Sequence, residues 1–137
     1  MNNLFVNPEK RIKIEIFVAL VNGRLVANAD KSIVEKEITD KDGKCNPEQI
    51  KAFHFSFKFP SYGDEVLISK GAVTTNAESE LEIDPARVRY ERFVKLLDSW
   101  DLVDGEGNPV PPTEDNIKNM NPTLAIAVIN ALEEKIS

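Results

Sequence analysis

The side chains that most often carry out acid–base or nucleophilic chemistry are scarce in this sequence. It contains one histidine, His54, and one cysteine, Cys45. A hydrolytic site needs a base held against a nucleophile, so the one pairing of this kind is a Cys45–His54 dyad. Cys45 lies beside an expected turn, and His54 lies on the polar side of an expected strand. We therefore favour an exposed histidine and an ordinary thiol over a catalytic pair.

Patterns that bind metals or phosphates are also missing from the sequence. A zinc site needs three or four ligands, and one Cys with one His fall short of that set. The acidic turns at 40–43 and 104–108 lack the spacing and the glutamate of a calcium loop. Gly105 and Gly107 are not followed by the Lys-Ser/Thr of a phosphate-binding loop. We predict no catalytic residue, no metal and no cofactor, and a protein that is not an enzyme.

The charged residues favour binding to other proteins. Seventeen basic against twenty-three acidic residues give a net charge of −6, which opposes binding to a nucleic-acid backbone. Four cations nevertheless cluster at Arg87, Arg89, Arg92 and Lys95. Such a cluster steers association with an acidic partner, so we take it as a candidate binding face. The alternative is a solvated helix side. If the cluster is a binding face, we expect reversal of Arg89 and Arg92 together to leave the fold intact.

Composition is that of a globular protein with one domain, or one domain and a small appendage. The 137 residues are 42% hydrophobic and 29% charged, enough to bury a core without metal or disulfide. One cysteine cannot form a disulfide within the chain, and the first residues lack a signal-peptide pattern, so we expect a reducing cytoplasm. The longest apolar stretch, at 16–21, is far short of the roughly 20 residues that span a bilayer. We expect no membrane partner.

The first 60 residues alternate between apolar and polar side chains, as β-strands do. Residues 12–20 place their aliphatic side chains on one face, and Asn22-Gly23 then supplies the positive φ angles of a type I′ hairpin. Residues 33–38 predict a third strand. The clearest strand carries His54 on one face and four aromatic side chains, the expected core of this half, on the other. These are Phe53, Phe55, Phe57 and Phe59.

Three segments of the middle region give weaker signals. Asn46 and Pro47 have the order of a cap and a first helical residue, so one helical turn is expected at 46–49. The segment 64–73 is compatible with a strand or with a short helix. The polar residues at 75–84 resemble a linker or a long loop.

From Asp84 the apolar spacing becomes that of a helix. Asp84 is a good cap and Pro85 suits the first turn, and the apolar side chains that follow are spaced by four, three, four and three residues. They are Ala86, Tyr90, Phe93, Leu97 and Trp100. The spacing predicts a helix of about 16 residues that ends at Trp100, which we expect to fill the junction of the helices.

The rest of the chain predicts a loop and two further helices. Residues 104–112 are rich in Gly and Pro and form the expected loop, and Thr113 caps a short helix. Asn121-Pro122 begins the last helix, whose apolar stripe contains Leu124, Val128 and Leu132. The sequence therefore predicts an α+β fold: an N-terminal antiparallel sheet with a hairpin, then a subdomain of two longer helices and one short helix. We place a β-rich domain at 1–75 and the helical subdomain at 76–137, with one compact domain as the alternative.

Residues 87–117 resemble a segment of small phage tail-assembly chaperones and related tail proteins. The resemblance is carried by a basic helix that ends in Ser99-Trp100, a Gly107-Asn108-Pro109-Val110 loop, and a helix capped by Thr113. The upstream segment 57–64 also resembles the Phe-x-Pro-x-x-x-Asp start of some members. Together these segments cover about 60 of the 137 residues. The β-rich N-terminal half departs from the largely helical members of that group.

The resemblance implies a non-enzymatic assembly chaperone that binds a tail component, typically the tape-measure protein, in the host cytoplasm. Apolar helix faces suit such a helical partner, so Leu124, Val128 and Leu132 join the four cations as candidate partner-binding residues. Two alternatives stay open: a structural virion protein of the tail, neck or baseplate, and a phage protein that inhibits a host factor. A homo-oligomer also remains open.

Overall fold

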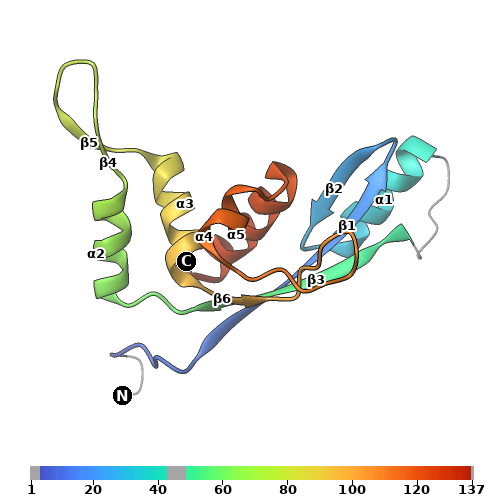
Figure 1. Cartoon of the computed structure of the whole chain (residues 1–137), viewed down its shortest axis with the longest axis horizontal. Helices are drawn as coiled ribbons and strands as arrows, with labels where there is room; N and C mark the ends of the chain where they lie inside the picture. The colour runs from blue at the N-terminus through green and yellow to red at the C-terminus, as the bar shows by residue number, and fades with distance from the viewer. Residues whose placement is uncertain (1–3, 43–48, 137) are drawn as a thin grey trace.

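The computed structural model describes residues 4–42 and 49–136 and has the predicted α+β fold (Figure 1). Four antiparallel strands form the main sheet, in the order β2-β1-β3-β6. They are β1 (Arg11–Val21), β2 (Arg24–Asn28), β3 (Lys51–Lys58) and β6 (Leu97–Trp100). A separate two-stranded hairpin consists of β4 (Val73–Thr75) and β5 (Leu81–Ile83). The helices are α1 (Lys31–Asp42), α2 (Tyr62–Gly71), α3 (Pro85–Leu96), α4 (Glu114–Lys118) and α5 (Pro122–Ile136).

Strand β1 separates two apolar cores. Ile12, Ile14, Ile16 and Val18 are buried on one face, in the main core that also contains α3 and α5 side chains. Ala19 and its neighbours on the other face pack against α1 in a smaller core. This confirms the predicted alternation for 12–18, because side chains of a strand point to opposite faces in turn, whereas Leu20 at the end of the series is exposed.

The predicted hairpin at Asn22-Gly23 is confirmed. Both residues have positive φ angles, 54° and 78°, and Val21 pairs with Arg24 across a two-residue turn. These angles are those of a type I′ turn, whose twist matches that of the flanking strands.

The phenylalanines of β3 supply much of the main core, as predicted. Phe55 and Phe57 are fully buried, and Phe53 and Phe59 are partly buried against the same cluster. Phe57 meets the ring of Phe93 edge-to-face, with 5.4 Å between centroids. β3 pairs with β1 on one side and β6 on the other, so this core joins the two halves of the chain.

The predicted strand at 33–38 is wrong, because these residues lie in helix α1. Val34 and Ile38, four residues apart, share one helix face and pack on Ala19 and Val21. Asp30 stabilises the start of the helix, where its carboxylate accepts hydrogen bonds from the backbone N–H and the hydroxyl of Ser32. In this segment the four-residue spacing of the apolar side chains and the cap favour a helix more strongly than the weak apolar–polar alternation favours a strand.

The middle region holds a helix and a hairpin. The ambiguous segment 64–73 lies mostly in α2, which Ser61 and Asp64 begin with a reciprocal capping box. The expected linker at 75–84 instead contains the β4–β5 turn. The side chain of Asn76 accepts hydrogen bonds from the N–H groups of Glu78 and Glu80, which closes this turn. Cys45 and most of the expected turn at 46–49 lie outside the described residues.

The helix that begins after Asp84 ends at Leu96, four residues earlier than predicted. The next residues form β6, which pairs with the free side of β3. A shift of register beside Ser56 lets both Leu97 and Trp100 pack against the main core from one short strand. Trp100 fills the junction between β3 and the following loop, because it meets Phe55 edge-to-face and its indole N–H donates to the carbonyl of Val110 at 2.6 Å.

The three predicted helix caps are confirmed. Asp84, Thr113 and Asn121 each accept a hydrogen bond from a backbone N–H at the start of α3, α4 and α5. The loop at 104–112 is ordered by Asp104, whose carboxylate accepts from two backbone N–H groups.

Candidate partner-binding site

The four clustered cations of α3 do not form an open positive face. Arg89 lies 2.7 Å from Glu133, and Arg92 lies 3.1 Å from Glu65. Glu91 has two cationic neighbours, Arg87 at 3.5 Å and Lys95 at 2.8 Å. Each cation therefore has a carboxylate neighbour, which cancels most of the positive potential that the sequence suggested.

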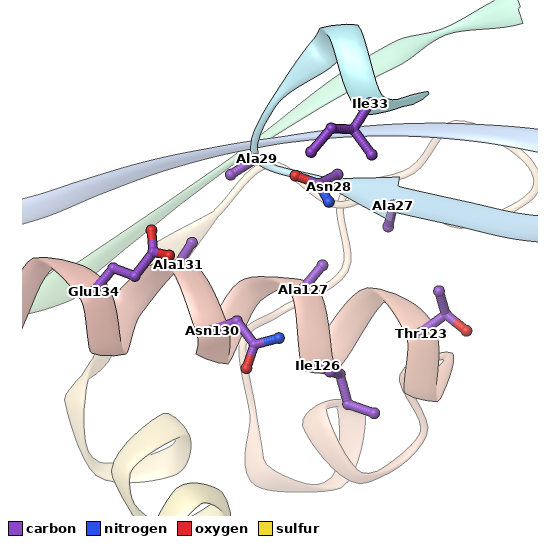
Figure 2. Close-up of a pocket in the computed structure, with 10 residues that line it drawn as sticks. All are labelled: Ala27, Asn28, Ala29, Ile33, Thr123, Ile126, Ala127, Asn130, Ala131 and Glu134. Atoms are coloured by element: carbon purple, nitrogen blue, oxygen red, sulfur yellow. The ribbon is translucent and has the colours of Figure 1, made fainter. Parts of the chain in front are cut away.

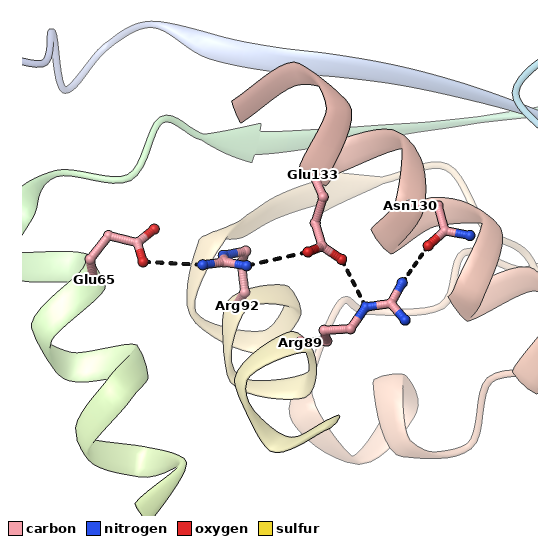
Figure 3. Close-up of polar contacts among 5 residues, drawn as sticks. All are labelled: Glu65, Arg89, Arg92, Asn130 and Glu133. Carbon is pink, nitrogen blue, oxygen red and sulfur yellow. Dashed lines mark hydrogen bonds and ion pairs between the residues drawn. The ribbon is translucent and has the colours of Figure 1, made fainter. Parts of the chain in front are cut away.

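Arg92 links three helices that are distant in sequence (Figure 3). Its guanidinium contacts Glu65 of α2 and, at 3.6 Å, Glu133 of α5. Glu133 also accepts from Arg89, which donates in turn to the side chain of Asn130. The Arg92 side chain is 18% exposed, so we no longer expect its reversal to leave the fold intact.

Glu91 is the buried centre of the other two ion pairs. It stands between Arg87 and Lys95 on α3 and is 8% exposed. α2 approaches it closely, because a Cβ atom at Gly71 would lie 2.8 Å from the Glu91 carboxyl carbon. The absence of a side chain at Gly71 thus lets α2 pack over this carboxylate.

The apolar stripe of α5 belongs to the main core. Val128 and Leu132 have no exposed surface, and Leu124 is partly buried against the same cluster. These three residues hold α5 on the sheet, and in the folded chain Val128 and Leu132 are removed from any surface that a partner could reach.

A different apolar surface lies between α3, α4 and α5. A cavity of about 560 Å³, here named the helical groove, opens between these helices. Phe93, Ile117 and Ile129 are buried side chains that line it, whereas Ile126 at its rim is 52% exposed. The remaining lining residues are Ala86, Arg89, Tyr90, Lys118, Met120, Pro122 and Ala125. A concave apolar surface with a few polar groups at its rim is typical of a site for a partner's side chains.

Tyr90 fixes one wall of the helical groove. Its hydroxyl donates to the carboxylate of Glu114 at 2.6 Å, which ties α3 to α4. Desolvation, and then the hydrogen bond to Glu114, raise the pKa of Tyr90 to about 12, and the same bond lowers the pKa of Glu114. The tyrosine therefore stays protonated as a donor at neutral pH, and its ring keeps a fixed position beside the groove.

His54 lies between two carboxylates on the open face of the sheet. Its Nδ1 atom is 2.7 Å from Asp101, and its Nε2 atom is 2.9 Å from Glu15. The hydrogen bond to Asp101, and then that to Glu15, raise the pKa of His54. Both ring nitrogens are engaged by acids, so this imidazole is not positioned to activate a hydroxyl as a general base. Cys45, the other member of the dyad that the sequence analysis considered and did not favour, lies outside the described ranges.

Within 4–42 and 49–136, no three or more His, Cys, Asp or Glu side chains gather so that they could hold a metal ion. None of the helices in these ranges has both the length and the apolar composition needed to cross a membrane.

No protein family, curated protein or solved structure matches this chain.

The helical groove was not predicted as a site from the sequence, although α5 carried a signal for it. Ala125, Ile126 and Ile129 lie beside the core stripe and widen the apolar part of α5 beyond the one face that a core requires.

Proposed function

We propose that this chain is a non-enzymatic assembly factor that binds a helical protein partner in the helical groove. The partner that the resemblance suggests is a phage tail component such as the tape-measure protein, bound in the host cytoplasm. The observation that carries the proposal is the position of the groove. Arg89, Tyr90, Phe93 and Ile117, which line it, all lie in the segment 87–117 that resembles tail-assembly chaperones.

The shape and chemistry of the groove support a helical partner. Amphipathic helices bind in apolar grooves through side chains spaced by three, four and seven residues. Buried Phe93, Ile117 and Ile129 offer such side chains an apolar floor. Lys118 is an exposed lining residue and favours an acidic residue on the polar side of the partner helix.

The proposal is tested by co-expression with the tape-measure protein encoded in the same genome. The wild-type chain is expected to keep that protein soluble and to co-purify with it. Ala125→Leu fills the groove, and Ala86→Glu places a charge in it. Each variant is expected to weaken binding of the tape-measure protein at least tenfold, a loss of about 1.4 kcal/mol or more in binding free energy, and to reduce the co-purified protein accordingly. Ala86 is exposed near the start of α3, where an acidic side chain suits the helix dipole, so the fold is retained.

The matched control is Ala77→Glu, the same change at an exposed alanine in the β4–β5 turn. It is expected to behave like the wild type. Failure of the wild-type chain to co-purify with the tape-measure protein would overturn the assignment of this partner. Equal co-purification by all four chains would overturn the assignment of the groove.

A further inference from the structure

The outer edge of β2 is a free strand edge in the described part of the chain. β2 ends the main sheet and pairs only with β1 there. Val21 and Arg24 flank the two-residue turn as a hydrogen-bonded pair, so Val26 and Asn28 also bond to β1. Leu25 and Ala27 consequently direct their N–H and C=O groups outward. An unpaired row of this kind is a template for another strand.

A groove follows this edge along the whole strand. Two cavities of about 510 and 440 Å³ share Ala27 and Thr123 as lining residues, and together we name them the edge groove. Figure 2 shows α5 running beside β2 and the start of α1, with the small side chains of Ala127 and Ala131 turned toward the strand. The two cavities leave room beside β2 for an extended segment.

The two ends of the edge groove differ in chemistry. Around Ala27 it is lined mainly by alanine and isoleucine side chains, among them Ile33 of α1. Near the hairpin it is lined by Arg24 and Lys41, with Glu37 as the acidic side chain there. An occupant of matching chemistry has apolar residues at one end and a negative charge at the other.

The N-terminal arm, residues 4–9, has this order of side chains. Leu4, Phe5 and Val6 are exposed, Phe5 by 89%, and Glu9 follows at the far end of the arm. Phe5 and Glu9 are about 13 Å apart in an extended chain, the span from Ala27 to the hairpin turn. With Phe5 opposite Ala27 in an antiparallel pair, Phe5 lies at the apolar end and Glu9 lies opposite Gly23, at the end of the edge groove that Arg24 and Lys41 line.

The arm is positioned away from the edge groove of its own chain. It leaves β1 at Arg11, and Ala27 pairs with Val18, about 23 Å further along that strand. In Figure 1 the segment that leads into β1 and strand β2 lie toward opposite ends of the main sheet. A turn bends the arm at 7–10, where Asn7 accepts from the N–H groups of Glu9 and Lys10 and Arg11 donates to the carbonyl of Pro8. These bonds are exposed, and the turn opens when the arm pairs as a strand with a second chain.

We propose that the arm of one copy of this chain binds as an added strand to the β2 edge of a second copy. Backbone hydrogen bonds to Leu25 and Ala27 supply the pairing, and Phe5 in the apolar end supplies the specificity. Burial of Leu4, Phe5 and Val6 removes roughly 300 Å² of apolar surface, well below the roughly 800 Å² that each partner buries in a stable interface. The association is therefore reversible and depends on concentration.

Analytical ultracentrifugation of the full chain over a wide concentration range tests this proposal. The wild type is expected to self-associate, whereas Phe5→Asp and Ala27→Pro are expected to stay monomeric. Proline at Ala27 removes an outward N–H and leaves the bonds to β1, and Phe5→Asp changes an exposed arm residue that folding does not need. The control is Leu81→Asp, which charges an exposed leucine of β5 and is expected to associate like the wild type.

A labelled peptide of residues 4–10 provides the second measurement. Its fluorescence anisotropy is expected to rise with the Phe5→Asp chain, whose edge groove is intact, and to stay low with the Phe5→Asp/Ala27→Pro chain. A wild type that is monomeric throughout, or self-association that persists in Phe5→Asp, would overturn the proposal. Equal peptide binding to both chains would also overturn it, because the β2 edge would then not be the site.

Discussion

Replacement of Arg92 by methionine tests whether the α3 cations hold the helices together or only cover a helix surface. The change keeps an unbranched apolar side chain and removes the guanidinium that contacts Glu65 and Glu133. If the network in Figure 3 joins α2, α3 and α5, its loss lowers the free energy of unfolding. The matched control is Arg87→Met, which removes a cation from the same helix.

The size of the loss follows from exposure. Arg92 is 18% exposed, but Glu65 and Glu133 are 38% and 36% exposed, so the pair lies between the exposed and buried limits. Exposed pairs contribute about 0.2–1 kcal/mol, and breaking a fully buried pair costs about 3–5 kcal/mol. The Nε atom of Arg92 is buried without an acceptor among the described residues, which reduces the loss. We expect a decrease of about 1–2 kcal/mol.

The assay is urea unfolding of both variants and the wild type. Arg87 is 52% exposed and has one carboxylate at 3.5 Å, so Arg87→Met is expected to cost less than about 0.5 kcal/mol. In a thermal melt, the same loss in Arg92→Met is expected to lower the melting temperature by roughly 3–8 °C for a chain of this size. Equal losses in the two variants, or a gain in Arg92→Met, would refute the assignment of Arg92 as a structural link between helices.

Three further predictions concern the sheet and its loops. Gly23→Val is expected to lose about 1 kcal/mol or more in urea unfolding, because valine is strained at the positive φ of 78° although no atom lies within 4 Å of its Cβ. Trp100→Phe removes the hydrogen bond to Val110 and is expected to cost about 0.5–1.5 kcal/mol plus some packing, measured in the same way. The raised pKa of His54 stabilises the fold fully below pH 6.5, and this stabilisation is lost as the pH rises through the raised value. The difference in urea midpoint between wild type and His54→Gln is therefore expected to shrink from pH 6 to pH 9. The change is expected to be small because the His54 side chain is 58% exposed. A difference that stays constant over this pH range would contradict the prediction.

The sequence predicted the elements that depend on local signals. Asn22-Gly23 readily adopts the positive φ angles of a tight turn in many surroundings, and Asp84 caps a helix by accepting a hydrogen bond from a backbone N–H two residues later. Two predictions failed where local signals compete. Val34 and Ile38 fit a weak alternation and also one face of a helix, and Leu97 follows a helical spacing yet lies in a strand. In the second case the free side of β3 decided the outcome, a tertiary effect that a local pattern does not contain.

The candidate site was harder to predict because its residues come together from distant parts of the chain. The cations of α3 were recognised, but their neutralising partners Glu65 and Glu133 lie 27 and 44 residues from Arg92 and Arg89. Likewise Phe93 was assigned to the apolar face of a helix. That a groove lies beside it depends on how α4 and α5 are placed next to α3. Periodicity identifies which side of a helix is apolar, but not how much of it a neighbour leaves uncovered.

Methyl NMR of the folded chain, titrated with the tape-measure segment that co-purifies with it, tests the central claim most directly. The predicted result is that the methyl signals of Ile117, Ile126 and Ile129 shift together, because all three line the helical groove. The signals of Leu81 and Ile83 on the exposed β4–β5 hairpin are predicted to stay in place. Shifts confined to the hairpin, or no shift in the three isoleucines at saturation, would contradict binding in the helical groove.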